Sequence, residues 1–430
     1  MLIGNAPRRV AVIGGSRTPF ARSYGAYNGS SNQQLLTAAL QAVVDRFGLR
    51  GQRLGDVIGG ATLKHSRDFN LTRESLLSIG LDPQTPGLDL QRACGTSLEA
   101  AILIANKIAL GQIDAGIAAG VECISDPPVV YPDSYRQVLL ASHRGRSLAQ
   151  RLTPFLKLRP RDFRPLLPAV VEPRTGLSMG QSCELMVKTW RLTREQQDRV
   201  AYDSHVKTAQ AWKDGFYDDL VVPFAGLTRD NNVRADTTME KLATLRPVFD
   251  TSGSGTLTAG NSTPLTDGAS ALLLASEDWA RARNLPILAW FRAGKTWAVD
   301  FVSGSEGLLM APAYAVAAML RDTGLALQDF DYYEIHEAFA AVPLCTLRAW
   351  ESADYCRERL GLAQPLGSID RSRLNVKGGS VAVGHPFAAT GARILAGLAK
   401  MLSMDGGAKR GLASACTAGG MGVSAILERA

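Results

Sequence analysis

The chain contains few of the residues that mark several common protein classes. It has only 6 cysteines and 5 histidines among 430 residues, and no cysteine pair has zinc-finger spacing. A disulfide scaffold and a zinc domain are therefore excluded. No run approaches the roughly 20 apolar residues of a membrane span, and the run at 10–13 is too short for a signal-peptide core. We expect a soluble cytoplasmic protein whose thiols are free for chemistry.

The overall composition is that of an ordinary globular protein. Hydrophobic residues make up 46% and charged residues 20%, which excludes a disordered or low-complexity chain. The length predicts two or three domains. The 47 Lys and Arg exceed the 40 Asp and Glu, for a net charge of +7. This excess suggests an anionic partner, and leaves nucleic acid, an acidic membrane surface and a phosphorylated substrate open.

Short apolar runs alternate with amphipathic stretches near both ends of the chain. This alternation predicts an α/β fold with two similar halves, each a mostly parallel sheet covered by helices. The expected strands are 10–13, 56–61, 88–90, 115–120, 269–275, 332–335, 411–415 and 423–427. The expected helices are 32–47, 98–110, 312–323 and 391–402. Residues 126–250 are rich in Pro and Arg but also apolar, which indicates a loop-rich insertion rather than a flexible linker.

Cys94 lies in the segment Gln91-Arg-Ala-Cys-Gly-Thr-Ser97, between an expected strand and an expected helix. At a helix N-terminus, the macrodipole and free N–H groups favour a thiolate and could hold a substrate oxyanion. A small buried cysteine is the commoner fate of a lone Cys, so a purely structural interpretation stays open.

His385 lies in Gly384-His-Pro386, after a glycine-rich approach and before an expected helix start. Such an elbow fixes one imidazole in place, as general-base catalysis requires. A turn histidine with a structural hydrogen bond is the other interpretation.

Two further segments could carry chemistry. Cys416 opens Cys-Thr-Ala-Gly-Gly420, a glycine-rich turn after an apolar strand whose backbone N–H groups could approach a ligand. The segment His336-Glu-Ala-Phe339 also follows an apolar strand. Adjacent residues do not share a helix face, so His336 and Glu337 are not expected to bind one metal.

Taken together and in this order, these segments resemble the thiolase family over nearly the whole chain. Residues 16–20, 258–263 and 265–269 also match family segments. His336 in place of the commoner Asn, Ala418 in place of Gly, and Ser178-Met-Gly-Gln-Ser182 are similar to the β-subunit of the fatty-acid oxidation trifunctional complex and its bacterial relatives. The resemblance implies a duplicated five-layer αβαβα fold with mixed sheets.

The resemblance also implies a division of the chain into three parts. An N-terminal half with the nucleophile would comprise 1–125 and 251–275. A loop domain would comprise 126–250, and a C-terminal half 276–430.

The family's chemistry assigns a role to each of the candidate catalytic residues. Cys94 would carry the acyl group as a thioester, His385 would take its proton, and Cys416 would protonate the departing acetyl-CoA carbanion. His336 and His385, with a water, would bind the enolate oxygen. The backbone N–H groups of Cys94 and Ala418 would form a second oxyanion hole.

The family's coenzyme A contacts map onto four positions. Thr263 would meet the pantetheine, Arg234 the adenine and phosphates, and Met179 and Phe339 would line the reacting end. A solvated surface arginine is an equally good interpretation of Arg234. Coenzyme A would be a substrate, and no permanently bound cofactor or metal is expected.

Most of the excess positive charge lies in one segment, residues 131–175. Its three acids are Asp133, Asp162 and Glu172. Its nine bases are Arg136, Arg144, Arg146, Arg151, Lys157, Arg159, Arg161, Arg164 and Arg174. Six apolar residues are interleaved in a partly helical pattern, so this could be a surface for anionic lipid or for a hydratase/dehydrogenase subunit. A solvated insertion that packs on its own dimer is the other interpretation.

The expected activity is thiolytic cleavage of 3-ketoacyl-CoA in β-oxidation by an oligomer that is at least a dimer. The same chemistry in reverse would condense two acetyl-CoA molecules. A silent CoA- or lipid-binding relative should lack Cys94, His385 or Cys416, and this chain keeps all three. Nucleic-acid binding is not expected, because the basic segment has few aromatics.

Overall fold

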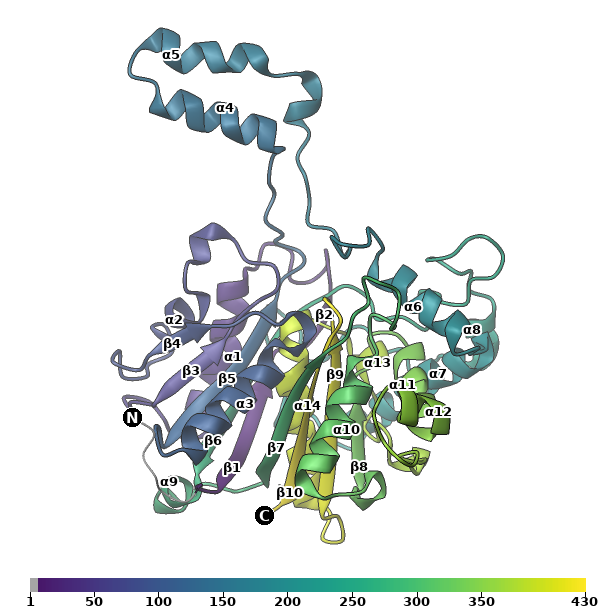
Figure 1. Ribbon diagram of the computed structural model, residues 1–430. Coiled ribbons are helices and arrows are strands. Elements are labelled where there is room, and N and C mark those ends of the chain that lie inside the picture. The colour runs from purple at the N-terminus through teal and green to yellow at the C-terminus, as the bar shows by residue number, and fades with distance from the viewer. Residues whose placement is uncertain (1–6) are drawn as a thin grey trace.

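The computed structural model describes residues 7–430, and Figure 1 shows two α/β halves side by side with a helical arm above them. One ten-stranded sheet runs through both halves of the described chain in the order β4-β3-β5-β6-β1-β7-β10-β9-β8, with β2 paired to β6. The first half contributes β1 (Val10–Arg17), β2 (Ala21–Arg22), β3 (Asp56–Gly59), β4 (Gly87–Asp89), β5 (Ala115–Glu122) and β6 (Thr266–Ser276). The second contributes β7 (Ala289–Ala298), β8 (Tyr332–Ile335), β9 (Arg410–Thr417) and β10 (Met421–Arg429).

The strand directions correct one expectation from the sequence. Parallel pairing is confined to β3–β4, β3–β5 and β8–β9, and the other strand pairs of the described chain are antiparallel. The prediction of mostly parallel halves was wrong, while the mixed sheets implied by the family resemblance are present. The antiparallel β7 was not predicted, because its polar and exposed residues hide the apolar pattern of a buried strand.

Two helices fill the space between the halves. They are α3 (Thr96–Ala109) and α14 (Thr390–Met404), and both pack on strands of both halves. They belong to one apolar core with β1, β6, β9 and β10. A helix that is apolar over most of its surface is stable only when buried on several sides, and both helices fit this requirement.

Outer helices complete the layers on either side. On the first half lie α1 (Asn32–Arg46), α2 (Leu71–Leu76) and α9 (Glu277–Ala282). On the second lie α10 (Ala311–Thr323), α11 (Ala341–Glu351) and α12 (Ala353–Glu358). The layers are helices, the first-half strands, α3 and α14, the second-half strands, and helices, which is the five-layer arrangement that the resemblance implied.

The insertion between the halves is more helical than its composition predicts. It contains α6 (Met179–Thr189), α7 (Arg194–Lys213) and α8 (Met239–Ala243). Ser178 and Thr193 begin α6 and α7 with complete capping boxes, a signal present in the sequence but hidden among Pro and Arg.

The earlier part of the insertion forms the arm in Figure 1. Its helices are α4 (Asp133–Arg144), α5 (Leu148–Leu152), η3 (Thr153–Lys157) and η4 (Pro160–Phe163). At its neck, Val130 and Leu166 exchange two backbone hydrogen bonds. Within residues 7–430, no helix has both the length and the apolar character needed to cross a membrane.

Candidate active site

Cys94 lies at the middle of a short turn, η2 (Ala93–Gly95), that joins β4 to α3. The preceding Ala93 has φ of 44°, a left-handed conformation that is strained for a residue with a side chain. The turn leaves Cys94 partly accessible, whereas the other five cysteines are buried. A strained turn that exposes one thiol is a feature of a functional site rather than of a packing cysteine.

The environment of Cys94 does not favour a resting thiolate. Burial raises the pKa of the Cys94 thiol to about 12, and the carboxylates of Glu122 and Glu172 act in the same direction. The backbone N–H groups of Ala418 and of Cys94 itself offset only part of this rise in pKa. The N–H groups at the helix terminus thus favour a thiolate, as predicted, but loss of water outweighs them and leaves the thiol protonated. The same two N–H groups are those that the family resemblance assigned to an oxyanion hole.

His385 is held in one orientation by its neighbours. It follows Gly384, whose φ of 106° only glycine adopts readily. Its Nδ1 lies 2.6 Å from the Thr390 hydroxyl at the start of α14. Burial, helped by the charge of Arg393, lowers the pKa of His385 to about 3. The imidazole is therefore neutral and available as a base.

His336 stands directly beside His385. Their Nε2 atoms are 3.2 Å apart, and His336 Nδ1 lies 2.7 Å from the hydroxyl of Ser380. Burial, together with His385 and Arg393, lowers the pKa of His336 well below its usual value. The two rings thus form a neutral pair whose Nε2 atoms meet at one point.

Cys416 occupies the end of β9 and is 1% exposed. Burial and the neighbouring Cys94 raise the pKa of its thiol, so Cys416 is a proton donor at neutral pH. The glycine-rich turn that follows is fixed by a residue of the insertion, because Gly419 N–H donates to Glu172 Oε1 at 2.6 Å. Cys94 and Cys416 therefore lie at one site, together with the turn that contains Ala418.

Glu337 anchors the loop that carries His336. Its carboxylate accepts hydrogen bonds from the Ser204 hydroxyl (2.8 Å), Asn375 Nδ2 (2.7 Å) and Val381 N–H (3.2 Å). These partners come from α7, from the loop before the glycines, and from α13 (Ser380–Val383). Glu337 thus has a positioning role that the sequence did not indicate. No cluster of three or more His, Cys, Asp or Glu arranged for a metal occurs among residues 7–430.

A pocket of about 410 Å³ lies beside the segment that precedes His385, because its lining residue Asn232 donates to Val383 O. Pro264 and Val381 also line the pocket, and Leu265, which follows Pro264, pairs with His385 in a parallel bridge. Arg22 and Arg234 line it too, and neither forms an ion pair within residues 7–430. Two free guanidinium groups in a pocket of this size suit a ligand that carries phosphates.

The pocket wall is tied to the first strand. Arg17 makes a buried bidentate ion pair with Asp230, at 2.6 and 2.7 Å. Asp230 Oδ1 also accepts the backbone N–H of Phe20 at 2.7 Å. The early sequence segment 16–20 therefore positions the pocket residues that directly follow Asp230.

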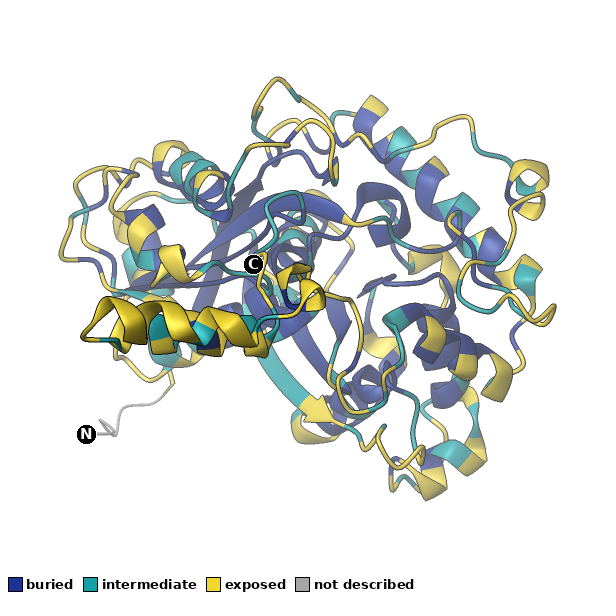
Figure 2. Ribbon diagram, turned by 90° about the horizontal axis from the view of Figure 1, so that it is seen from above, coloured by how far each residue is buried: buried dark blue, intermediate teal, exposed yellow. Residues whose placement is uncertain are grey.

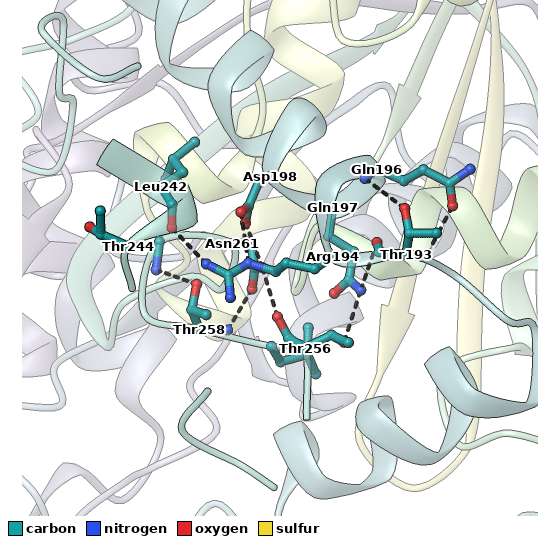
Figure 3. A network of polar contacts seen from close by, with 12 residues as sticks. Thr193, Arg194, Gln196, Gln197, Asp198, Leu242, Thr244, Thr256, Thr258 and Asn261 are labelled. Atoms are coloured by element: carbon teal, nitrogen blue, oxygen red, sulfur yellow. Dashed lines mark hydrogen bonds and ion pairs between the residues drawn. The ribbon is translucent and has the colours of Figure 1, made fainter. Parts of the chain in front are cut away.

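A polar network supports the opposite wall, as Figure 3 shows. Asp198 accepts Arg194 Nε at 2.7 Å and Asn261 Nδ2 at 2.9 Å, while Arg194 Nη2 donates to Leu242 O at 2.6 Å. Asn261 O accepts the backbone N–H of Ala340 at 2.9 Å. The network thus connects α7, the pocket wall and the loop that carries His336.

The other three residues predicted to contact coenzyme A are Thr263, Met179 and Phe339, and they contact the segments that carry His336 and Cys416. Thr263 Oγ1 donates to Ala338 O at 2.9 Å, so this hydroxyl holds the loop that carries His336. Met179 and Phe339 belong to the apolar cluster that contains Cys416. Phe339 packs edge to face on Phe249, with centroids 5.7 Å apart.

Two family descriptions match consecutive parts of the chain. "Thiolase, N-terminal domain" matches residues 10–278, and "Thiolase, C-terminal domain" matches residues 287–429. Proteins described as 3-ketoacyl-CoA thiolase from Yersinia pestis and Yersinia pseudotuberculosis are 39% identical over 426 residues, covering 98% of this chain and 97% of theirs.

Solved structures show the same likeness. The acetyl-CoA acetyltransferase of Bacillus anthracis has a TM-score of 0.82 at 30% identity, covering 99% of this chain and 100% of its own. Human mitochondrial 3-ketoacyl-CoA thiolase in complex with CoA has a TM-score of 0.81 at 27% identity, covering 98% of both chains.

Proposed function

This chain belongs to the thiolase family, and we propose that it cleaves 3-ketoacyl-CoA with free CoA, yielding acetyl-CoA and an acyl-CoA shortened by two carbons. The observation that carries the proposal is that a half-buried cysteine, a buried cysteine and a neutral histidine pair lie on neighbouring segments. Cys94 contributes to the raised pKa of Cys416, and His336 N–H donates to Ser414 O on the strand that holds Cys416. The Yersinia relatives, described as 3-ketoacyl-CoA thiolases, support the degradative direction.

In the first half-reaction, the Cys94 sulfur attacks the 3-keto carbon and its proton passes to His385. Because the pKa of Cys94 is about 12 and that of His385 about 3, the proton moves only as the new bond forms. The bond between C2 and C3 then breaks, and its electron pair stays on C2 of acetyl-CoA. Cys416 protonates C2, leaving acyl-Cys94, a Cys416 thiolate and protonated His385.

In the second half-reaction, the CoA thiol gives its proton to the Cys416 thiolate and attacks the acyl group. Cys94 leaves and recovers its proton from His385, so the cycle is balanced. His336 Nε2 and His385 Nε2 meet at one point, which suits an oxyanion on the thioester of the leaving acetyl group. The N–H groups of Cys94 and Ala418 suit the oxyanion on the attacked carbonyl.

Thiolysis of a series of 3-ketoacyl-CoA substrates from four to sixteen carbons tests this function. We expect CoA-dependent cleavage, with activity extending beyond the four-carbon substrate. Activity on acetoacetyl-CoA alone would favour the alternative, condensation of two acetyl-CoA. CoA binding without turnover of any substrate would favour a catalytically silent CoA- or lipid-binding relative of the family.

We further propose that the pocket beside Arg22 and Arg234 binds the phosphates of CoA. Its volume of about 410 Å³, its unpaired arginines and the bridge from Leu265, next to its lining residue Pro264, to His385 support this assignment. The family resemblance also implies that the protein forms an oligomer of at least two copies. A reducing compartment, the cytoplasm, fits a mechanism that needs Cys94 and Cys416 as free thiols.

The arm suits an anionic surface. Of the eight bases within residues 131–165, only Arg136 forms an ion pair among the described residues. Figure 2 shows its helices almost entirely exposed. Leu148, Leu152, Phe155 and Leu156 recur at helical spacing along α5 and η3, and Leu148 and Leu156 are 73% and 85% exposed. An apolar stripe flanked by cations is the pattern of a helix that lies on an anionic membrane.

We therefore propose that the arm attaches this enzyme to an anionic lipid surface. Replacing residues 131–165 by a short Gly-Ser link across the neck should abolish sedimentation with vesicles that contain anionic lipid, while sparing thiolysis. Leu156→Ser should weaken sedimentation, and the exposed but distant Met404→Ser serves as its control. Unchanged sedimentation would overturn the proposal. Failure to bind vesicles, with co-purification of a hydratase/dehydrogenase subunit, would favour the protein partner instead.

A further inference from the structure

Ser380 is the junction between the histidine pair and a partly buried arginine. Arg393 Nη2, from the first turn of α14, lies 2.9 Å from the Ser380 hydroxyl oxygen. The same oxygen lies 2.7 Å from His336 Nδ1. Ser380 is fully buried, and its side chain has no other polar partner among residues 7–430.

The donor capacity of each group fixes the direction of these bonds. A guanidinium group only donates, so the Ser380 oxygen must accept from Arg393. The one hydrogen of the Ser380 hydroxyl then has a single acceptor in reach, His336 Nδ1. This makes Nδ1 the unprotonated nitrogen of His336, and a neutral imidazole must then carry its hydrogen on Nε2.

The hydrogen bonds of His385 continue in the same donor-to-acceptor direction. His336 Nε2–H donates to His385 Nε2, 3.2 Å away, so His385 carries its hydrogen on Nδ1. His385 Nδ1–H donates to the Thr390 hydroxyl at 2.6 Å, and Thr390 donates onward to Pro386 O at 3.4 Å. Each of the five hydrogen bonds that link Arg393 Nη2 through Ser380, His336, His385 and Thr390 to Pro386 O then has one donor and one acceptor.

The reverse direction leaves a buried hydroxyl without an acceptor. If His336 Nδ1 carried the hydrogen, Ser380 would receive two N–H groups and its own hydrogen would have no partner. An unsatisfied buried donor costs about 1–3 kcal/mol, a factor of about 5 to 150 in the ratio of the two arrangements. The bond from Thr390 to Pro386 would also be lost. Arg393 therefore determines which arrangement is populated.

We propose that Arg393, acting through Ser380, is a positioning residue that sets the tautomers of both histidines. This deepens the proposed thiolase function and rests on it. The selected arrangement leaves His385 Nε2 unprotonated, and this nitrogen can take the Cys94 proton once it has given up the bond from His336 Nε2–H. After proton transfer, His336 Nε2–H and His385 Nε2–H are both donors at one point, as an oxyanion requires. The opposite tautomers would supply neither the base nor the pair of donors.

The surroundings allow a charged arginine to remain here. Arg393 is partly buried, and loss of water lowers the pKa of its guanidinium, while Glu334 on β8 opposes this change most strongly. Tyr217 and Glu337 act in the same sense, whereas Arg17 opposes them. The arginine therefore stays a fixed donor, which a neutral and rotatable group would not be.

Neutron diffraction from perdeuterated crystals of the wild-type protein at neutral pH tests the assignment without a substitution. We expect nuclear density for deuterium on His336 Nε2 and His385 Nδ1, with the Ser380 deuteron directed at His336. Density on His336 Nδ1 or His385 Nε2 would overturn the proposal. Absence of thiolysis in the wild type would instead count against the proposed function, so the two failures are distinguishable.

Kinetics of a matched pair of variants supply the functional test. Ser380→Ala should lower kcat about 10²-fold with KM changed less than about 2-fold, because wrong tautomers impair the reacting step rather than binding. Ser424→Ala removes another fully buried hydroxyl, whose hydrogen bond is to Ser414, and serves as the control. Arg393→Lys should retain more kcat than Arg393→Met. A kcat of Ser380→Ala within 3-fold of wild type would overturn the proposal.

Discussion

The reactivity of Cys94 should depend on pH in a way that separates two views of its activation. If the helix terminus stabilised a thiolate, alkylation would be fast and independent of pH above about 7. Burial instead raises the pKa of Cys94 to about 12, so the thiolate fraction should rise tenfold for each pH unit between 7 and 10. The other five cysteines are buried, which makes alkylation by iodoacetamide a measure of Cys94 alone.

The size of the effect follows from the pKa. At pH 8 a free thiol of pKa about 8.5 is roughly one quarter thiolate, whereas a thiol of pKa about 12 is about 10⁻⁴ thiolate. The more basic thiolate is intrinsically about 40-fold more nucleophilic, at a Brønsted coefficient of about 0.45. Alkylation of Cys94 at pH 8 should therefore be roughly 60-fold slower than that of an exposed peptide thiol. Cys94→Ala provides the blank, and a rate that levels off between pH 7 and 9 would refute the reasoning.

Three further substitutions have defined outcomes. Glu172→Gln removes a negative charge that raises the pKa of Cys94, so alkylation at pH 8 should become several-fold faster; an unchanged rate would contradict this electrostatic contribution. Cys416→Ser should slow exchange of the acetyl-CoA methyl protons with solvent more than acyl transfer to Cys94, and equal losses would argue against separate roles. Gly384→Ala places a methyl group 2.6 Å from Asn232 Nδ2 at φ of 106°, so it should destabilise the protein by about 3 kcal/mol in denaturant unfolding. Gly397→Ala, in open space on α14, should be neutral or stabilising, and similar losses in both glycine variants would refute the steric argument.

The sequence predicted the elements that carry the apolar pattern of a buried core. Strands at 115–122 and 266–276 and helices at 96–109 and 390–404 lie within a few residues of where alternation placed them. Strand direction could not be predicted in this way. A buried run such as that of β6 has the same appearance whether its neighbours are parallel or antiparallel.

The positions of the candidate site residues followed from motif order, but their electrostatics did not. The turn at Cys94 does precede a helix, as predicted. The pKa of its thiol depends on burial by distant segments and on Glu122 and Glu172, which lie 28 and 78 residues away along the chain. Such groups carry no local signal in the sequence.

The supporting residues were missed for a similar reason. Ser380 and Arg393 occupy a glycine-rich loop and an apolar helix, where neither residue type is unusual. Their importance comes from a chain of hydrogen bonds between His336, Ser380 and Arg393, which are far apart in the sequence and meet only in the folded protein. The division into three domains remains a prediction, as do the individual catalytic roles.

The most direct test of the account is the intact mass of the protein after incubation with an acyl-CoA. The wild-type chain should gain the mass of one acyl group, removable by free CoA, and Cys94→Ala should gain none. An acyl adduct that persists on Cys94→Ala would contradict the central claim that Cys94 carries the acyl group.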